Sequence, residues 1–152
     1  SKGKTRAYEL RKQMQKVMMD NVGVFREESA MKEAVKQVQE LRERYQTDLA
    51  FDDNGYQYNT DLMEAWELGC LLDLAEVTAI SALNRTESRG GHSREDYQKR
   101  DDDNWLVHTL AYRKSEIAYP VTPPEVELNI NKKVDMSLAD EDPRFLPKER
   151  AY

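Results

Sequence analysis

The sequence has little glycine, proline or cysteine. Its 6 glycines and 5 prolines make up about 7% of 152 residues, against about 12% in an average chain. So few chain-breaking residues favour long helices. The single Cys70 cannot form an internal disulfide, which is typical of a reducing compartment, and its apolar neighbours predict a small buried side chain, with a reactive thiol as the alternative.

Long apolar runs and an excess of positive charge are also missing. No run approaches the roughly 18 apolar residues of a membrane-spanning helix, and the N-terminus lacks a signal peptide's apolar core. The 23 Lys and Arg residues against 29 Asp and Glu give a net charge of −6. An acidic chain argues against nucleic acid and against a polybasic membrane surface. We therefore expect a soluble cytoplasmic chain with no nucleic-acid partner.

Nucleotide and metal motifs are absent. The glycines, at positions 3, 23, 55, 69, 90 and 91, allow neither GxGxxG nor P-loop spacing. His92 and His108 lie sixteen residues apart without a zinc-site pattern, and the aspartates at 101–103 lack EF-hand spacing, which predicts a solvated loop or a helix cap. His92, Ser93 and Asp96 are neighbours in one loop and are not expected to converge on a reacting atom. The sequence predicts no catalytic, cofactor-binding or metal-binding residue.

Three stretches have helical periodicity. Apolar residues recur at steps of three and four over residues 5–21 and 27–48, with Gly23 as the break between them. A third helix begins near Asp61, with Asn59 and Thr60 as further candidate caps, and is expected to end at Gly90 and Gly91. We predict a mainly α fold in which residues 1–91 form an antiparallel, up-down-up, spectrin-like three-helix bundle.

The third helix is apolar on nearly all sides, which predicts burial on all sides. Two amphipathic neighbours cover only part of its circumference. The remainder is expected to meet another domain or subunit, with Trp66 and Trp105 as interface residues, or else the C-terminal tail.

Residues 92–152 are predicted to form a loop, a β-hairpin and an extended tail. Alternation over 105–112 indicates a strand, Lys114 and Ser115 a turn, and 117–121 the partner strand. The last thirty residues combine proline and charge without periodicity, so they are expected to pack on the bundle or on absent partner domains.

Particular motifs carry a family resemblance. They are TESRGGHSREDY at 86–97, RDDDNW at 100–105, HTL at 108–110, MQKVM at 14–18, VGVFR at 22–26 and PKERAY at 147–152. In these segments the chain resembles the flavoprotein subunits of succinate dehydrogenase and fumarate reductase. The resemblance implies the C-terminal helical domain and tail of a much larger subunit that binds FAD upstream, where the catalytic residues also lie. This chain alone would then be inactive.

The resemblance also implies a reaction and partners. The parent would oxidise succinate to fumarate and pass electrons through FAD to an iron–sulfur subunit and quinone. It would lie peripherally on the cytoplasmic or matrix face of the inner membrane, contacting the membrane anchor subunits indirectly. Asn104, Trp105 and the HTL segment with its long tail resemble succinate dehydrogenase more than L-aspartate oxidase, and fumarate reductase runs the reverse reaction on the same architecture.

In the turn after the third helix, Arg89, His92, Arg94 and Asp96 are expected to dock the helical domain against the upstream FAD or capping domain. The alternative is a local network that satisfies the end of the third helix. A second functional hypothesis is a stand-alone helical adaptor that binds a partner through Trp66. The missing initiator Met at Ser1 favours a fragment, and the isolated fragment is expected to form a homodimer.

Overall fold

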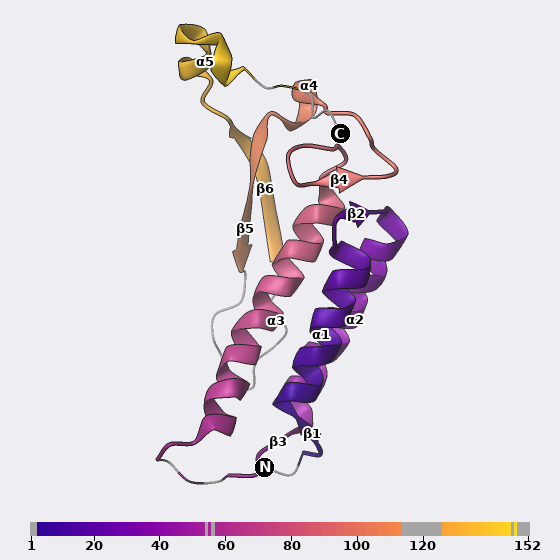
Figure 1. The fold of residues 1–152 in the computed structure, drawn as a ribbon, viewed down its shortest axis with the longest axis vertical. Coiled ribbons are helices and arrows are strands. Elements are labelled where there is room, and N and C mark those ends of the chain that lie inside the picture. Colours follow the sequence, from indigo (N-terminus) through magenta and orange to yellow (C-terminus); the bar gives the residue numbers. More distant parts are fainter. Residues whose placement is uncertain (1–2, 54, 56, 114–125, 147, 149–152) are drawn as a thin grey trace.

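The computed structural model describes residues 3–53, 55, 57–113, 126–146 and 148. Three long helices dominate it: α1 (Ala7–Val22), α2 (Glu28–Thr47) and α3 (Thr60–Asn84). Each contacts the other two, and they lie side by side in Figure 1. A two-stranded antiparallel sheet packs beside the upper part of α3. The predicted mainly α fold with a hairpin is confirmed.

Two short parallel strand pairs hold the ends of the helices together. At one end β1 (Thr5–Arg6), before α1, pairs with β3 (Leu49–Ala50), after α2. At the other end β2 (Phe25–Arg26), between α1 and α2, pairs with β4 (Ser93–Arg94), after α3. The β2–β4 pair places the residues that follow α3 directly against the α1–α2 connection.

The core lies where the three helices face one another. Its largest members recur at helical spacing and are almost completely buried: Leu10, Met14, Met31, Val38, Leu41, Leu68 and Leu72. α1 and α2 bury one face each and expose charged residues on the other, as their amphipathic sequences predict.

α3 buries only one face against α1 and α2, as expected of two neighbours, and its burial by another domain or subunit stays a prediction. Its small residues Ala65, Ala75 and Ala79 face the core. The opposite side carries an apolar ridge, defined by Leu62, Met63, Trp66, Cys70, Leu71 and Leu74, that is open to solvent. Cys70 is therefore exposed, contrary to prediction, because α1 and α2 cover one side of α3 only.

α3 ends at Asn84, before the Gly90 and Gly91 pair that was expected to stop it. Arg85 leaves the helix with an extended backbone, φ −81° and ψ 106°. The free carbonyls of the last turn accept hydrogen bonds from the Arg94 side chain, so they need no glycine cap.

Gly90 serves a tight turn instead. Its φ of +56° is in the left-handed region, where a side chain is strained. Around it Arg89 and His92 exchange two backbone hydrogen bonds, of 2.8 and 2.9 Å. The turn reverses the chain, so that His92 and Arg94 contact the Arg85 carbonyl at the end of α3.

The start of α3 is capped by Asn59, whose side chain accepts a hydrogen bond from the Leu62 N–H at 2.8 Å. Of the three candidate caps the structure uses this one. Asp61 instead accepts hydrogen bonds from the backbone N–H groups of Asp52 and Asp53, which ties the preceding loop to the first turn.

The hairpin has a different second strand from the one predicted. β5 (Val107–Arg113) pairs antiparallel with β6 (Val126–Lys133). The expected turn at Lys114 and Ser115 and the expected strand at 117–121 lie outside the described residues. β6 falls in the segment predicted as an extended tail, yet its sequence VELNIN alternates apolar and polar residues, the pattern of a half-exposed strand.

Two further corrections concern short helices. Trp105 closes α4 (Asp102–Trp105), which Asp101 caps, and does not begin the strand. The tail also forms α5 (Ser137–Glu141) and a 3₁₀ turn at Pro143–Phe145. Aspartates at the starts of such turns satisfy free N–H groups locally, which a search for long periodicity does not detect.

Candidate functional site

A cluster of arginines and carboxylates fills the end of the bundle where α3 stops. We call it the arginine cluster, and its members are Arg26, Arg85, Glu87, Arg89, His92, Arg94, Asp96, Arg100 and Asp102. They come from β2, from the turn after α3, from β4 and from the start of α4, which meet at the upper end of the bundle in Figure 1.

Glu87 is the central anion of the arginine cluster and is completely buried. Its carboxylate accepts hydrogen bonds from Arg85 Nη1 at 2.5 Å, Arg89 Nε at 2.8 Å and the Asp101 N–H at 2.8 Å. Burial by itself would raise the pKa of Glu87, but these donors outweigh it and hold the pKa below its usual value. Glu87 is therefore a charged structural anchor.

Arg94 is buried as well and caps α3. Its Nε and Nη2 donate to the two oxygens of Asp96, each at 2.6 Å, and its Nη1 donates to the Leu83 and Arg85 carbonyls at 3.1 Å. The Tyr97 ring lies 5.0 Å from its guanidinium carbon. The hydrogen bond from Arg94 is the main reason that the pKa of Asp96 is lowered.

His92 lies between Arg26 and the end of α3. Arg26 Nη1 donates to His92 Nδ1 at 2.7 Å, so this nitrogen is the acceptor and the proton is on Nε2, which donates to the Arg85 carbonyl at 3.1 Å. Burial, followed by the charges of Arg26, Arg94 and Arg85, lowers the pKa of His92 despite that carbonyl. The ring is therefore neutral near pH 7.

The structure thus brings Arg89, His92, Arg94 and Asp96 into one place, as the sequence suggested. Each of these four residues also contacts partners inside the chain, as the local-network alternative describes. The role of the four residues in docking another domain stays a prediction. Glu87 was missed, although its position two residues from an arginine on either side is a signal for a shared ion pair.

The two tryptophans differ in their exposure to solvent. Trp66 is 71% exposed on the apolar ridge of α3. Trp105 is buried, its ring N–H donates to Thr86 Oγ1 at 3.1 Å, and the Arg85 guanidinium lies 4.9 Å from its ring centroid. Trp66 is available to a partner as this chain stands, whereas Trp105 already packs within it.

A pocket of about 610 Å³ opens beside the arginine cluster, between the last turns of α3 and the start of β5. Arg26, Arg89 and His92 are among the residues that line it. Trp105, Val107 and Val134 contribute apolar side chains to the same lining. The pocket therefore combines positive charge with an apolar wall.

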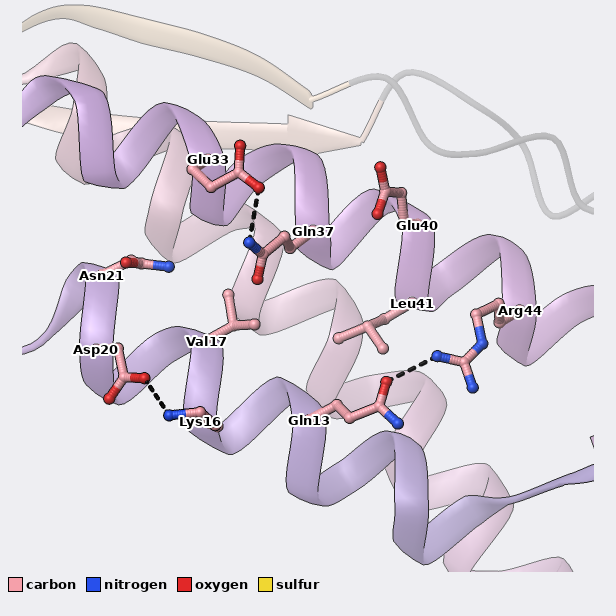
Figure 2. Close-up of a pocket in the computed structure, with 10 residues that line it drawn as sticks. All are labelled: Gln13, Lys16, Val17, Asp20, Asn21, Glu33, Gln37, Glu40, Leu41 and Arg44. Atoms are coloured by element: carbon pink, nitrogen blue, oxygen red, sulfur yellow. Dashed lines mark hydrogen bonds and ion pairs between the residues drawn. The ribbon is translucent and has the colours of Figure 1, made fainter.

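A second pocket of about 520 Å³ lies between α1 and α2. Figure 2 shows that several of its polar side chains interact with one another: Lys16 pairs with Asp20 at 2.6 Å, and Arg44 donates to the amide oxygen of Gln13 at 2.7 Å. Glu33 accepts a hydrogen bond from Gln37 at 2.7 Å. These pairs leave no convergent set of reactive groups in that groove.

The described residues offer no recognised metal site and no membrane-spanning helix. Within the described ranges no three His, Cys, Asp or Glu side chains are placed to hold a metal ion. None of the helices in those ranges combines the length and apolarity needed to cross a bilayer. The three long helices follow the N-caps Arg6, Glu27 and Asn59, and none of them starts at the glycine-rich turn that admits a dinucleotide phosphate, so these helix starts do not fit the FAD pyrophosphate.

The described fold is a three-helix bundle with a two-stranded sheet beside it and the arginine cluster at one end. Comparison with known families places it: residues 11–152 match the family described as the fumarate reductase flavoprotein C-terminal region. The chain belongs to this family, whose members include the flavoprotein subunits of succinate dehydrogenase and fumarate reductase, as the sequence motifs indicated.

Similar proteins include both enzymes. The chain is 43% identical over 141 residues to the succinate dehydrogenase flavoprotein subunit of Coxiella burnetii, covering 93% of this chain and 22% of that protein. It is 45% identical over 104 residues to the fumarate reductase flavoprotein subunit of Haemophilus influenzae, covering 68% and 17%. The chain thus spans about a fifth of the length of these relatives.

Solved structures have the same fold. The FrdA chain of E. coli quinol fumarate reductase matches with a TM-score of 0.74 and 34% identity, over 88% of this chain and 22% of that one. Mycobacterium smegmatis Sdh1 in complex with UQ1 matches with a TM-score of 0.79 and 28% identity, over 93% and 22%. The arrangement of helices and hairpin is therefore shared with much larger chains.

Proposed function

We propose that this chain is the C-terminal helical domain of a succinate dehydrogenase flavoprotein subunit and that it supports domain packing and subunit contact without an active site of its own. The parent subunit would oxidise succinate to fumarate and pass electrons through FAD to an iron–sulfur subunit and quinone. The observation that carries the proposal is the family match over residues 11–152 combined with coverage of about a fifth of the relatives.

The surface of the domain supports this proposal. The ridge on α3 exposes Leu62, Met63, Trp66 and Leu74 at 51%, 65%, 71% and 63%, and several large apolar side chains exposed on one side of a helix are typical of a protein interface. Burial of such side chains against the upstream FAD and capping domains, or against the iron–sulfur subunit, would give it a function. Arg89, His92, Arg94 and Asp96 would align the domain from its other end.

Asn104, Trp105 and the HTL segment at 108–110 favour succinate dehydrogenase over L-aspartate oxidase. The extent of the match does not separate succinate dehydrogenase from fumarate reductase, because the Rickettsia conorii succinate dehydrogenase subunit and the Haemophilus fumarate reductase subunit both match 68% of this chain. The parent would lie peripherally on the cytoplasmic or matrix face of the inner membrane, attached through anchor subunits.

The decisive experiment changes Trp66 to Glu in the subunit of full length. Because Trp66 is exposed here, the change should leave the folding of the domain intact. We expect a several-fold loss of bound flavin, of succinate oxidation, or of co-purifying iron–sulfur subunit. Tyr8→Gln, an exposed aromatic residue on α1, is the matched control. Unchanged flavin, activity and assembly in Trp66→Glu would contradict the packing role.

The alternative function is a stand-alone adaptor that binds another protein through the same ridge. The same apolar surface favours it, since an adaptor also needs an exposed recognition face. The size of the native polypeptide separates the two. Detection of this sequence within a chain of the relatives' length supports the domain, and a native chain of 152 residues supports the adaptor.

A further inference from the structure

Arg26 has no carboxylate partner in the described part of the chain. Its Nε donates to the carbonyls of Val22 and Gly23, at 3.2 and 3.0 Å, and its Nη1 donates to His92 Nδ1. These contacts fix the guanidinium at the end of α1. They leave one Nη1 hydrogen and both Nη2 hydrogens without a partner among the described residues.

This situation is unusual within the arginine cluster. Arg94 is paired with Asp96, and Arg89 is paired with both Glu87 and Asp102. Arg26 is half-buried, as Arg89 is, and burial lowers the pKa of Arg26 with no compensating carboxylate among the described residues. A cation withdrawn from water without a counter-ion is costly, and an anion that joins it recovers part of that cost.

His92 cannot be the counter-ion. It is neutral and accepts a hydrogen bond from Arg26 while donating to the Arg85 carbonyl. Its effect is to fix the direction of Nη1 and so the plane of the guanidinium. A guanidinium held in this way loses little further freedom when it binds a planar carboxylate.

The pocket of about 610 Å³ gives the missing anion a place. Arg26 lies on its wall together with Thr78, Ser81 and Thr109, whose hydroxyls can donate or accept hydrogen bonds. The rest of the wall includes Val77, Trp105 and Val134. A single carboxylate fills only a small part of this volume, so the body attached to the carboxylate would meet the apolar wall.

We propose that this pocket is a carboxylate-binding site, in which Arg26 pairs with one carboxylate carried on a small apolar body. Two sources have this chemistry: a free carboxylic acid, or an Asp or Glu side chain beside an apolar residue in the upstream part of the polypeptide. The second source rests on the proposed function, and the first does not.

The test titrates the 152-residue chain, with ¹⁵N-labelled arginine, against sodium isovalerate, sodium acetate and sodium chloride at constant ionic strength. The Nε–H signal of Arg26 is observable because two carbonyls protect it. We expect it to shift saturably with isovalerate and more weakly with acetate, since each buried methylene adds up to about fourfold in affinity. The Nε–H of Arg11, whose partner Glu67 is exposed, is the internal control.

Two results would overturn the site. One is an Arg26 signal that moves no more than that of Arg11, or moves equally with chloride. The other is unchanged isovalerate binding, followed through the methyl signals of Val77, in Arg26→Gln. If Arg26→Gln fails to fold because α1 loses the capping contacts to Val22 and Gly23, the titration of the unaltered chain decides.

The source is identified by repeating the titration on the native polypeptide of full length. If isovalerate no longer shifts Arg26 there, the polypeptide itself supplies the carboxylate. If the shift persists, the site takes a free acid. Failure of the proposed domain role leaves the titration of the 152-residue chain interpretable, because that experiment needs no upstream domain.

Discussion

At the residue scale, buried charge organises one end of this protein. Glu87 and Arg94 are fully buried, yet every charged group that they bring into the interior is paired. Their partners lie two residues away in sequence, so the turn after α3 carries both signs of charge with it. The pairs stop α3 and orient the segment toward β2, and each can be tested by a substitution.

Arg94→Met should destabilise the chain by about 3–5 kcal/mol, because it leaves Asp96 without its partner and the carbonyls at the end of α3 without a donor. The matched control is Arg144→Met, since Arg144 has the same two-residue, two-bond geometry with Asp142 but is exposed. Urea unfolding should show no change for the control. Equal losses of stability in Arg94→Met and Arg144→Met would show that burial of Arg94 is not the cause of the destabilisation.

His92 should make stability depend on pH. Its pKa is lowered in the folded chain, so below pH of about 6.5 the unfolded chain binds a proton that the folded chain does not. Stability should therefore fall from pH 7.5 to 5.5, by at most about 1.4 kcal/mol per pH unit. His92→Gln should flatten that part of the urea-unfolding profile.

The control for this prediction is His108→Gln, which removes the other of the two histidines and leaves His92 with its partners. It should keep the slope of the unaltered chain. The chosen range lies above the ordinary pKa values of Glu87, Asp96 and Asp102, which are lowered further in the fold. A slope that survives His92→Gln would contradict the assignment.

At the element scale, α3 has two apolar faces with different tasks. One face is built of small residues and leucines that meet α1 and α2, and the other is the exposed ridge around Trp66. The sequence of α3 is apolar on both, so periodicity alone cannot tell which face the chain buries for itself. Substitutions on the two faces should therefore change the free energy of unfolding by different amounts.

Leu68→Ala should cost about 2–5 kcal/mol of unfolding free energy, because Leu68 is completely buried between the helices. Trp66→Gln, two residues earlier on the same helix, should change it by no more than about 0.5 kcal/mol, because Trp66 is exposed. Thermal or urea unfolding of both variants checks this. A large loss for Trp66→Gln would mean that the ridge is buried within the chain.

At the scale of the whole molecule, the chain leaves the large apolar side chains of the α3 ridge exposed to solvent. The family relatives are about five times as long, which is consistent with the proposal that further domains cover the ridge. Separated from them, two copies of the chain could bury their ridges against each other. The homodimer expected from the sequence is therefore a proposal about the isolated chain.

Sedimentation equilibrium over a range of concentrations tests the dimer. We expect the apparent mass to rise with concentration from that of the monomer, 17.8 kDa, toward twice that value. Trp66→Gln should shift the profile back toward the monomer, and Tyr8→Gln should leave it unchanged. A monomeric profile of the unaltered chain at the highest concentration would defeat the proposal.

The sequence by itself determined the three helices, the break at Gly23 and the motif that forms the arginine cluster. These are local features: apolar spacing, chain breakers and neighbouring charges have the same effect in any context. It also contained the alternation of β6, which proline and charge on either side obscured.

Only the tertiary structure decided the rest. Packing of α1 and α2 on one side of α3 left Trp66 and Cys70 exposed, and it buried Trp105 beneath Arg85. Capping by Arg94 ended α3 before its glycines, since a side chain from ten residues further on satisfied the carbonyls. Long-range contact placed Arg26 beside His92 without a carboxylate. Such outcomes depend on which distant groups meet in space, and local sequence does not specify that.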